Sequence, residues 1–147
     1  MTLNDTATLY KILHVRKDEK NRALIEQQRA VDQFELVANQ LYEQLKVKEQ
    51  AEMTLHKYIQ SEVIMKIQEQ TVYIDSLKTK INELQREVQI ARDHMEQRRS
   101  IVTEKHVELK KIEKLIERKE KHAKKIAAKL ESKQMDEISL NQFFRAE

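Results

Sequence analysis

The side chains that could carry out chemistry in this chain are five histidines and many carboxylates. The histidines are His14, His56, His94, His106 and His122. No two of them are four residues apart, the spacing at which one face of a helix presents two imidazoles to a metal ion. The chain has no cysteine and no glycine, which excludes thiolate chemistry, disulfides and glycine-rich phosphate loops. We therefore expect no catalytic residue, no cofactor and no metal site.

The composition favours long helices over a rounded core. Of the 147 residues, 39% are hydrophobic and 36% are charged, and none is proline. Without proline nothing interrupts a helix from inside, and without glycine the left-handed helix caps are disfavoured. No apolar stretch approaches the length of a membrane span, and residues 1–25 lack the apolar segment of a secretory signal. We expect a cytosolic protein with no transmembrane segment.

Apolar residues recur every seven positions in the second half of the chain. All ten members of one series are apolar: Ile67, Ile74, Ile81, Val88, Met95, Val102, Leu109, Ile116, Ala123 and Leu130. Half of a companion series, three residues later each time, is apolar as well: Gln70, Leu77, Leu84, Ala91, Arg98, Lys105, Ile112, Lys119, Ile126 and Lys133. Alternating spacings of three and four over this length are typical of the seam of a coiled coil.

The first part of the chain repeats the pattern more loosely. One register contains Leu24, Val31, Ala38, Leu45 and Ile59, and the other contains Leu13, Phe34, Leu41 and Leu55. Polar residues interrupt these registers at Lys17, Lys20, Gln27, Lys48 and Glu52. Polar seam residues lower stability but fix the register of a coiled coil.

The two patterns are out of phase across residues 56–66, which predicts a turn there. Ser61 followed by Glu62 resembles the start of a second helix, with an N-cap and an acid in the first turn. We therefore expect an all-α fold, a long two-helix antiparallel coiled-coil hairpin with a short C-terminal tail. The expected single domain, 1–147, has helices at about 5–58 and 65–134, a turn at about 58–65 and a tail at 135–147. One continuous helix that dimerises in parallel is the alternative.

The unequal arms predict that the second helix extends past the first, over part of residues 115–133. Four seam residues, Ile116, Ala123, Ile126 and Leu130, would then form a binding surface. The other interpretation, that they pack against Leu9, Ile12 and Leu13, stays open. The tail holds a further apolar cluster, and "SLNQ" at residues 139–142 predicts a capped helical turn. The cluster consists of Met135, Ile138, Leu140, Phe143 and Phe144.

Charge and tyrosines divide the chain into two functional regions. Residues 26–75 contain nine acids and five bases, a net charge of −4, whereas residues 98–133 contain thirteen bases and six acids, a net charge of +7. A basic helix can bind nucleic acid, an anionic membrane or an acidic protein, or can simply be a solvated face. Nucleic acid is not expected, because no stacking aromatics alternate with these bases. Tyr42 and Tyr73 lie in the acidic region, either as interface anchors or as cover for the seam.

Three stretches resemble the FliJ family of bacterial flagellar export proteins. They are "FELVANQLYEQL" in the first helix, "YIDSLKTKI" after the turn and "KQMDEISLNQFF" at the C-terminus. The chain departs from some relatives in having "IQEQTVYI" beside the turn. The resemblance implies a non-catalytic antiparallel coiled coil similar to the γ stalk of rotary ATPases. It also implies three partners: the hexameric export ATPase, the cytoplasmic domain of the membrane export-gate protein, and export chaperones.

The resemblance also implies where these partners bind. The gate would contact Tyr42, Tyr73 and Leu77, and the ATPase ring would contact Arg118, Lys121, Lys125, Phe143 and Phe144. The protein would be cytoplasmic and associated peripherally with the cytoplasmic face of the cell membrane at the flagellar base. A general coiled-coil scaffold or holdase-like chaperone is the alternative function, and duplex DNA binding through residues 98–133 is a third.

Overall fold

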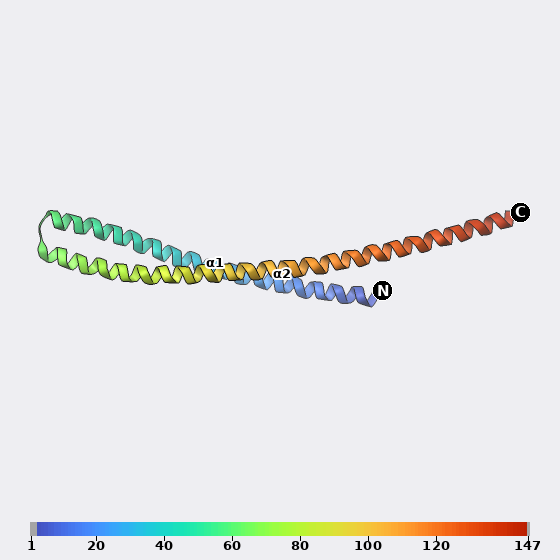
Figure 1. The fold of residues 1–147 in the computed structure, drawn as a ribbon, viewed down its shortest axis with the longest axis horizontal. Helices are drawn as coiled ribbons and strands as arrows, with labels where there is room; N and C mark the ends of the chain where they lie inside the picture. Colours follow the sequence, from blue (N-terminus) through green and yellow to red (C-terminus); the bar gives the residue numbers. More distant parts are fainter. Residues whose placement is uncertain (1–2, 147) are drawn as a thin grey trace. The chain divides into compact units, whose positions relative to one another are not determined.

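The computed structural model describes residues 3–146 and contains two long helices, α1 (Leu3–Gln60) and α2 (Ile64–Ala146). Figure 1 shows them running in opposite directions from the turn that joins them. The described residues contain no strand. The predicted all-α, two-helix antiparallel hairpin is confirmed. The chain divides into a turn unit, residues 22–103, and a terminal unit that combines residues 1–21 with residues 104–147.

The turn occupies residues 61–63 and is closed by backbone hydrogen bonds. The Val63 N–H donates to the Tyr58 carbonyl at 3.4 Å, and the Glu62 N–H donates to the Ile59 carbonyl at 3.2 Å. These two bonds, with Glu62 at a φ of 57°, form a Schellman motif that ends α1. A left-handed cap therefore forms without glycine, because its two hydrogen bonds offset the steric cost of a side chain at positive φ.

The start of α2 differs from the prediction. The Ile67 N–H donates to the Val63 carbonyl at 3.0 Å, so Val63 is the N-cap, and the first turn of α2 contains no acid. The predicted N-cap, Ser61, is wrong: it precedes Glu62 in the motif that ends α1. The Schellman motif uses these residues to satisfy carbonyls of α1, which leaves them unavailable as a cap for α2.

Replacing Glu62 by glycine should stabilise the hairpin. Glycine adopts positive φ without the penalty of about 1–2 kcal/mol that a Cβ atom incurs. Part of this gain is lost because glycine increases the entropy of the unfolded chain. We therefore expect the free energy of unfolding to rise by about 0.5–1 kcal/mol, measured by urea denaturation followed by circular dichroism. Ser61→Gly is the control: Ser61 lacks a positive φ, so glycine there should destabilise. Equal effects of the two substitutions would contradict this account.

The seam of the turn unit pairs large residues on α2 with small residues on α1. The buried residues of α2 are Ile74, Leu77, Ile81, Leu84 and Ala91, and those of α1 are Ala23, Ala30, Val37 and Ala51. Ala51, Ile74 and Leu77 form one buried cluster, against which Leu55 packs. Most of the apolar area that this unit removes from water therefore belongs to α2.

The predicted registers of α2 agree with this seam, but one predicted register of α1 agrees only in part, because Val31 and Ala38 are half-buried and its other three residues are exposed. Leu24, Leu45 and Ile59 are 41%, 42% and 52% exposed, whereas the residues before two of them, Ala23 and Tyr58, are buried and half-buried. The second predicted register of α1 is correct, because Leu13, Phe34, Leu41 and Leu55 are all half-buried. An alanine in the seam leaves room for the large side chains of α2, and leucines there would overfill it.

Helix α2 continues without a break to Ala146. Residues 135–146, which the sequence set apart as a tail, are therefore helical, and Ser139 lies inside α2 instead of beginning a new turn. No proline or glycine interrupts this segment, and glutamine, leucine, arginine and alanine are all favourable helix residues. No helix in the described range 3–146 is long and apolar enough to cross a membrane.

Candidate partner-binding surfaces

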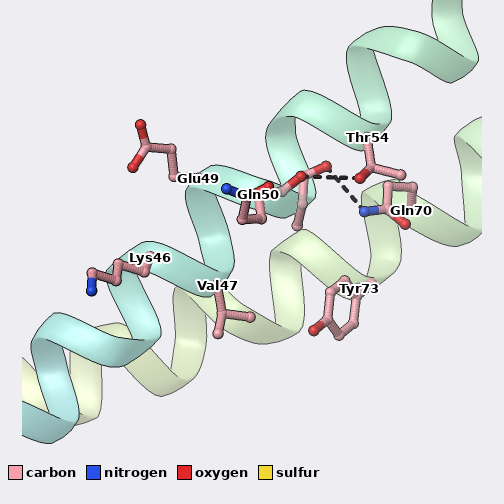
Figure 2. A pocket seen from close by; sticks show the side chains of 8 residues that line it. Lys46, Val47, Glu49, Gln50, Thr54, Gln70 and Tyr73 are labelled. Carbon is pink, nitrogen blue, oxygen red and sulfur yellow. Dashed lines mark hydrogen bonds between the residues drawn. The ribbon is translucent and has the colours of Figure 1, made fainter.

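A groove between α1 and α2 lies beside Tyr73 in the turn unit. It has a volume of about 680 Å³. Figure 2 shows Gln70 and Tyr73 projecting from α2 and Val47, Gln50 and Thr54 from α1. The Gln70 side chain donates a hydrogen bond to the Ala51 carbonyl at 3.0 Å, which fixes the floor of the groove. The groove therefore presents the exposed side chains of Tyr73 and Gln50 beside the apolar Val47.

Tyr42 and Tyr73 are both accessible, with exposed fractions of 56% and 47%. The ammonium of Lys46 lies 4.4 Å from the centre of the Tyr42 ring, a cation–π contact that orders the tyrosine on the helix surface. Lys46 also lines the groove that holds Tyr73, although Tyr42 itself does not. Sequence reasoning missed Val47 and Gln50, because residues at the edge of a seam have no apolar period of their own, and it treated Gln70 only as a polar member of the companion series.

Leu77, the third predicted gate residue, is not accessible. Its side chain is 7% exposed and packs with Ala51 and Ile74 in the buried cluster of the turn unit. Leu77 is therefore covered by its own hairpin in this fold, which leaves Tyr42 and Tyr73 as the accessible residues of the predicted gate set. Its membership of the companion series in α2 already pointed to the seam.

Two charged pairs replace apolar seam contacts in the terminal unit. On α1, Arg16 donates to Glu19 at 3.1 Å. On α2, the Lys105 ammonium is 3.7 Å from Glu108. Between the helices, Lys105 is 3.6 Å from Glu19 and Arg16 is 3.9 Å from Glu108. The sequence carries a signal for this network: a base precedes an acid by three residues on both helices, so antiparallel pairing places opposite charges together.

Acid should weaken this charged network. The Arg16 guanidinium, which donates a hydrogen bond to Glu19, lowers the pKa of the Glu19 carboxyl below its usual value of 4.5, and Lys105 contributes in the same direction. Because the folded pKa is lower than the unfolded pKa, the stabilisation is complete above about pH 4.5 and is lost as pH falls through the lowered folded value. Glu19→Gln should therefore destabilise the chain at pH 7 but have little effect at pH 3.

Urea denaturation of both chains at the two pH values measures this difference. Glu35→Gln is the matched control, because Glu35 is exposed and has no ion pair within the described residues. A Glu19→Gln effect that is the same at pH 7 and pH 3 would rule out the electrostatic contribution.

The last contacts between the helices of the terminal unit lie near Glu120. Leu9 and Ile116 are buried there, and the Tyr10 hydroxyl donates a hydrogen bond to the Glu120 carboxylate. This bond is the main cause of the raised pKa of Tyr10. Ile116 is 6% exposed, so of the two interpretations of this segment the one in which it packs against the start of α1 fits Ile116, whereas Ile126 and Leu130 are exposed. Every described residue from Glu120 to Ala146 is exposed, and we call residues 121–146 the overhang.

The overhang and its base present both basic and apolar side chains. Arg118, Lys121 and Lys125 are exposed, and Lys121 pairs with Glu117 at 3.2 Å. Phe143 and Phe144 are 62% and 68% exposed and meet edge to face, with ring centroids 6.1 Å apart. The five residues predicted to contact the ATPase are therefore all accessible on one helix. A groove of about 460 Å³ lies on the same helix, lined by Lys119, His122, Ala123, Ile126, Ala127 and Leu130.

The described residues offer no arrangement for metal chemistry. No group of three or more histidine, aspartate or glutamate side chains within residues 3–146 could hold a metal ion. The turn unit presents an open groove, and the terminal unit presents a helical segment, residues 121–146, whose described side chains are all exposed. These features define a two-helix coiled-coil protein with two accessible surfaces.

Comparison with known proteins identifies the family. The family model "Flagellar FliJ protein" matches residues 5–147. The chain is also 37% identical over 136 residues to the flagellar FliJ protein of Bacillus subtilis (strain 168), covering 90% of this chain and 91% of that relative. No solved structure gives a significant match. The chain belongs to the flagellar FliJ family and is thus a component of the bacterial flagellar export apparatus.

Proposed function

We propose that the protein is a non-catalytic stalk and regulator that links the hexameric export ATPase to the membrane export gate. The observation that carries the proposal is the overhang: every described residue of 121–146 is exposed, including two phenylalanines and a series of lysines. A helix with exposed apolar side chains is stabilised by binding a partner, because binding removes that area from water. Family membership makes a part of the export apparatus the partner to test first.

The ATPase is assigned to the overhang because of its charge and its aromatic end. Lys121 and Lys125, with Arg118 just before them, can pair with acidic residues that line a ring of subunits. Phe143 and Phe144 add two large apolar side chains of the kind that dominate binding energy at interfaces. One helix can enter a narrow central opening that a hairpin would not fit.

ATP hydrolysis by the export ATPase of the same organism tests this assignment. We expect stimulation by a stoichiometric amount of the full chain and none by a chain that ends at Glu120, because the terminal unit keeps its buried contacts up to Ile116 and Glu120. Phe143→Ala with Phe144→Ala should reduce stimulation, and Val72→Ala, which removes an exposed side chain of the turn unit, should not. Undiminished stimulation by the truncated chain would reject the assignment.

The gate is assigned to the surface around Tyr73 and Tyr42. Tyr73 lines the groove between the helices, and Tyr42 is held by Lys46, which lines the same groove. Tyrosine is enriched at interface hot spots because it combines a large apolar ring with a polar tip. The surrounding net charge of −4 over residues 26–75 favours a basic surface on the gate domain.

Binding of the isolated cytoplasmic gate domain, measured by titration calorimetry, tests the second assignment. Tyr42→Ala combined with Tyr73→Ala should weaken binding by at least about 2 kcal/mol, the usual threshold for a hot spot, while helicity stays unchanged. Ile90→Ala is the matched control, since Ile90 is 64% exposed in the same unit but does not line this groove. Unchanged affinity of the double variant would remove the gate from this surface.

Transfer of export chaperones and a position at the cytoplasmic face of the membrane complete the proposal. A stalk bound to both the ATPase and the gate would hold arriving chaperones where their cargo is released. The exposed apolar residues of the overhang also support the second candidate, a holdase-like chaperone. The two functions differ in specificity: a holdase suppresses aggregation of unrelated proteins, whereas a stalk requires the ATPase and the gate.

A further inference from the structure

Cations occupy two seam positions of the terminal unit. Arg16 lies seven residues after the buried Leu9 in the seam series of α1. Lys105 lies seven residues before the half-buried Ile112 in the companion series of α2. Both cations are themselves half-buried. They belong to the charged network described above, whose other members are Glu19 and Glu108. The network therefore interrupts the apolar seam of the terminal unit on both helices.

The charged network joins the two helices through long contacts. The two ion pairs that cross between the helices measure 3.6 Å and 3.9 Å, distances too great for hydrogen bonds. The Oε2 atom of Glu108 is shielded from water and accepts no hydrogen bond. A carboxylate oxygen in this position loses its hydration without full compensation. Parting the helices at the network would return this oxygen to water, so the network resists opening less than an apolar layer would.

Between the charged network and the start of α1, the apolar seam is short. Among the described residues, the terminal unit has three buried apolar residues and the turn unit has nine; the three are Leu9, Leu109 and Ile116. The outermost contact is the hydrogen bond from Tyr10 to Glu120, which is exposed. Segments with few buried apolar contacts open at a lower free energy than the rest of a protein. The first part of α1 is therefore held more weakly than the turn unit.

We propose that residues 3–21 of α1 form a strap that detaches from α2 as one cooperative unit, opening at the charged network while the turn unit stays paired. A helical segment of this length is marginal in water without a packing partner. The strap therefore loses part of its helical structure when it detaches. Closing restores the ion pairs and the apolar contacts together, which makes the opening reversible.

The strap controls how much of the seam of α2 is accessible. Leu109 and Ile116, which are buried in the terminal unit, belong to the same heptad series as the exposed Ala123 and Leu130. Opening the strap extends the exposed series by two heptads. A partner that binds the extended series would shift the strap toward its open state. The opening itself does not depend on the functions assigned to the overhang, because it involves only this chain.

Hydrogen exchange of the full chain, followed residue by residue by NMR, tests for the opening. Relative to their intrinsic rates, amides of residues 8–19 should exchange about 100-fold faster than those of residues 30–41 in the same helix. They should also share one opening free energy, because the strap opens as a unit. Protection equal to that of residues 30–41 would overturn the proposal. Protection that falls steadily toward Leu3, as in simple fraying, would overturn it too.

Thiol labelling tests whether α2 is uncovered, and the chain contains no native cysteine that would interfere. Leu109 and Leu77 are 6% and 7% exposed, so Leu109→Cys and Leu77→Cys are the same substitution at equal burial in the two units. We expect the thiol at position 109 to react about tenfold faster with a soluble disulfide reagent than the thiol at position 77. Equal rates would contradict the opening of the strap.

Replacing the charged network by an apolar layer tests where the strap opens. The variant combines Arg16→Leu and Lys105→Leu with Glu19→Gln and Glu108→Gln, which leaves the net charge unchanged. Hydrogen exchange in the strap should slow by about tenfold, because well-packed apolar residues hold a seam at least as firmly as an ion network. Lys11→Leu with Lys111→Leu, at two exposed positions of the same unit, is the control and should leave exchange unchanged. Exchange in the network variant as fast as in the original chain would overturn the proposal.

Discussion

Leu77→Ala should lower the free energy of unfolding of the hairpin by about 2–4 kcal/mol, as large-to-small substitutions in packed cores do. Leu77 is 7% exposed and shares a buried cluster with Ala51 and Ile74. Alanine at this position removes the apolar contacts of three carbon atoms, and a seam between two long helices cannot collapse fully around the cavity. Urea denaturation followed by circular dichroism at 222 nm measures the change.

Leu45→Ala is the matched control for this experiment. It is the same substitution in the same unit, but Leu45 is 42% exposed, so we expect a loss below about 1 kcal/mol. The comparison also bears on partner binding: Leu77→Ala should impair every activity in proportion to the unfolded fraction, whereas Tyr73→Ala should act on one partner only. A Leu77→Ala chain with unchanged stability would mean that the seam does not contain this residue.

Ala30→Leu should destabilise the hairpin, although it makes the chain more hydrophobic. Ala30 is 3% exposed, the lowest value among the buried residues of the described chain. Extra methylene groups at a filled position force the side chains and helices apart, at a cost of typically 1–3 kcal/mol. We expect a decrease of about 2 kcal/mol in the free energy of unfolding, measured by the same denaturation experiment.

Ala128→Leu separates packing from helix propensity in this comparison. Ala128 is exposed in the overhang, and alanine and leucine differ little as helix residues. Its replacement should therefore change the free energy of unfolding by less than about 0.5 kcal/mol. If Ala30→Leu stabilised the chain instead, the seam would have to be loosely packed at Ala30. Leu24 and Leu45, not the residues before them, would then face α2.

The sequence predicted α2 more accurately than α1, because the two helices use different residues in the seam. In α2 the seam consists of isoleucine and leucine, whose period stands out in a polar chain. In α1 the seam consists mainly of alanine, which does not contrast with exposed positions. Exposed leucines one position later, such as Leu24 and Leu45, then dominate the pattern. A spacing of seven between Ala23, Ala30 and Val37 was the signal that could have corrected the register.

The details of the turn depend on backbone geometry that the residue types do not reveal. The phase change located the turn within residues 58–65, and the structure places it at 61–63. Its cap uses Glu62 at positive φ, a position at which glycine or asparagine is expected. For the candidate sites, exposure followed from position in the heptad: Tyr42 and Tyr73 lie outside the seam series and are accessible, whereas Leu77 lies within one and is not.

The seam is so narrow that the two arms of the turn unit can change length in steps of one heptad. No large side chain in the described residues is less than 2% exposed, so each layer of the seam contacts only the layers beside it. The turn is closed by its own backbone bonds and does not depend on the layers behind it. Seven residues can therefore be lost or gained opposite each other, for example 24–30 together with 95–101, without changing the phase of either arm. Each such step alters the arm by about 10 Å, which would let evolution adjust the length of the arms while leaving the surfaces proposed for the partners untouched.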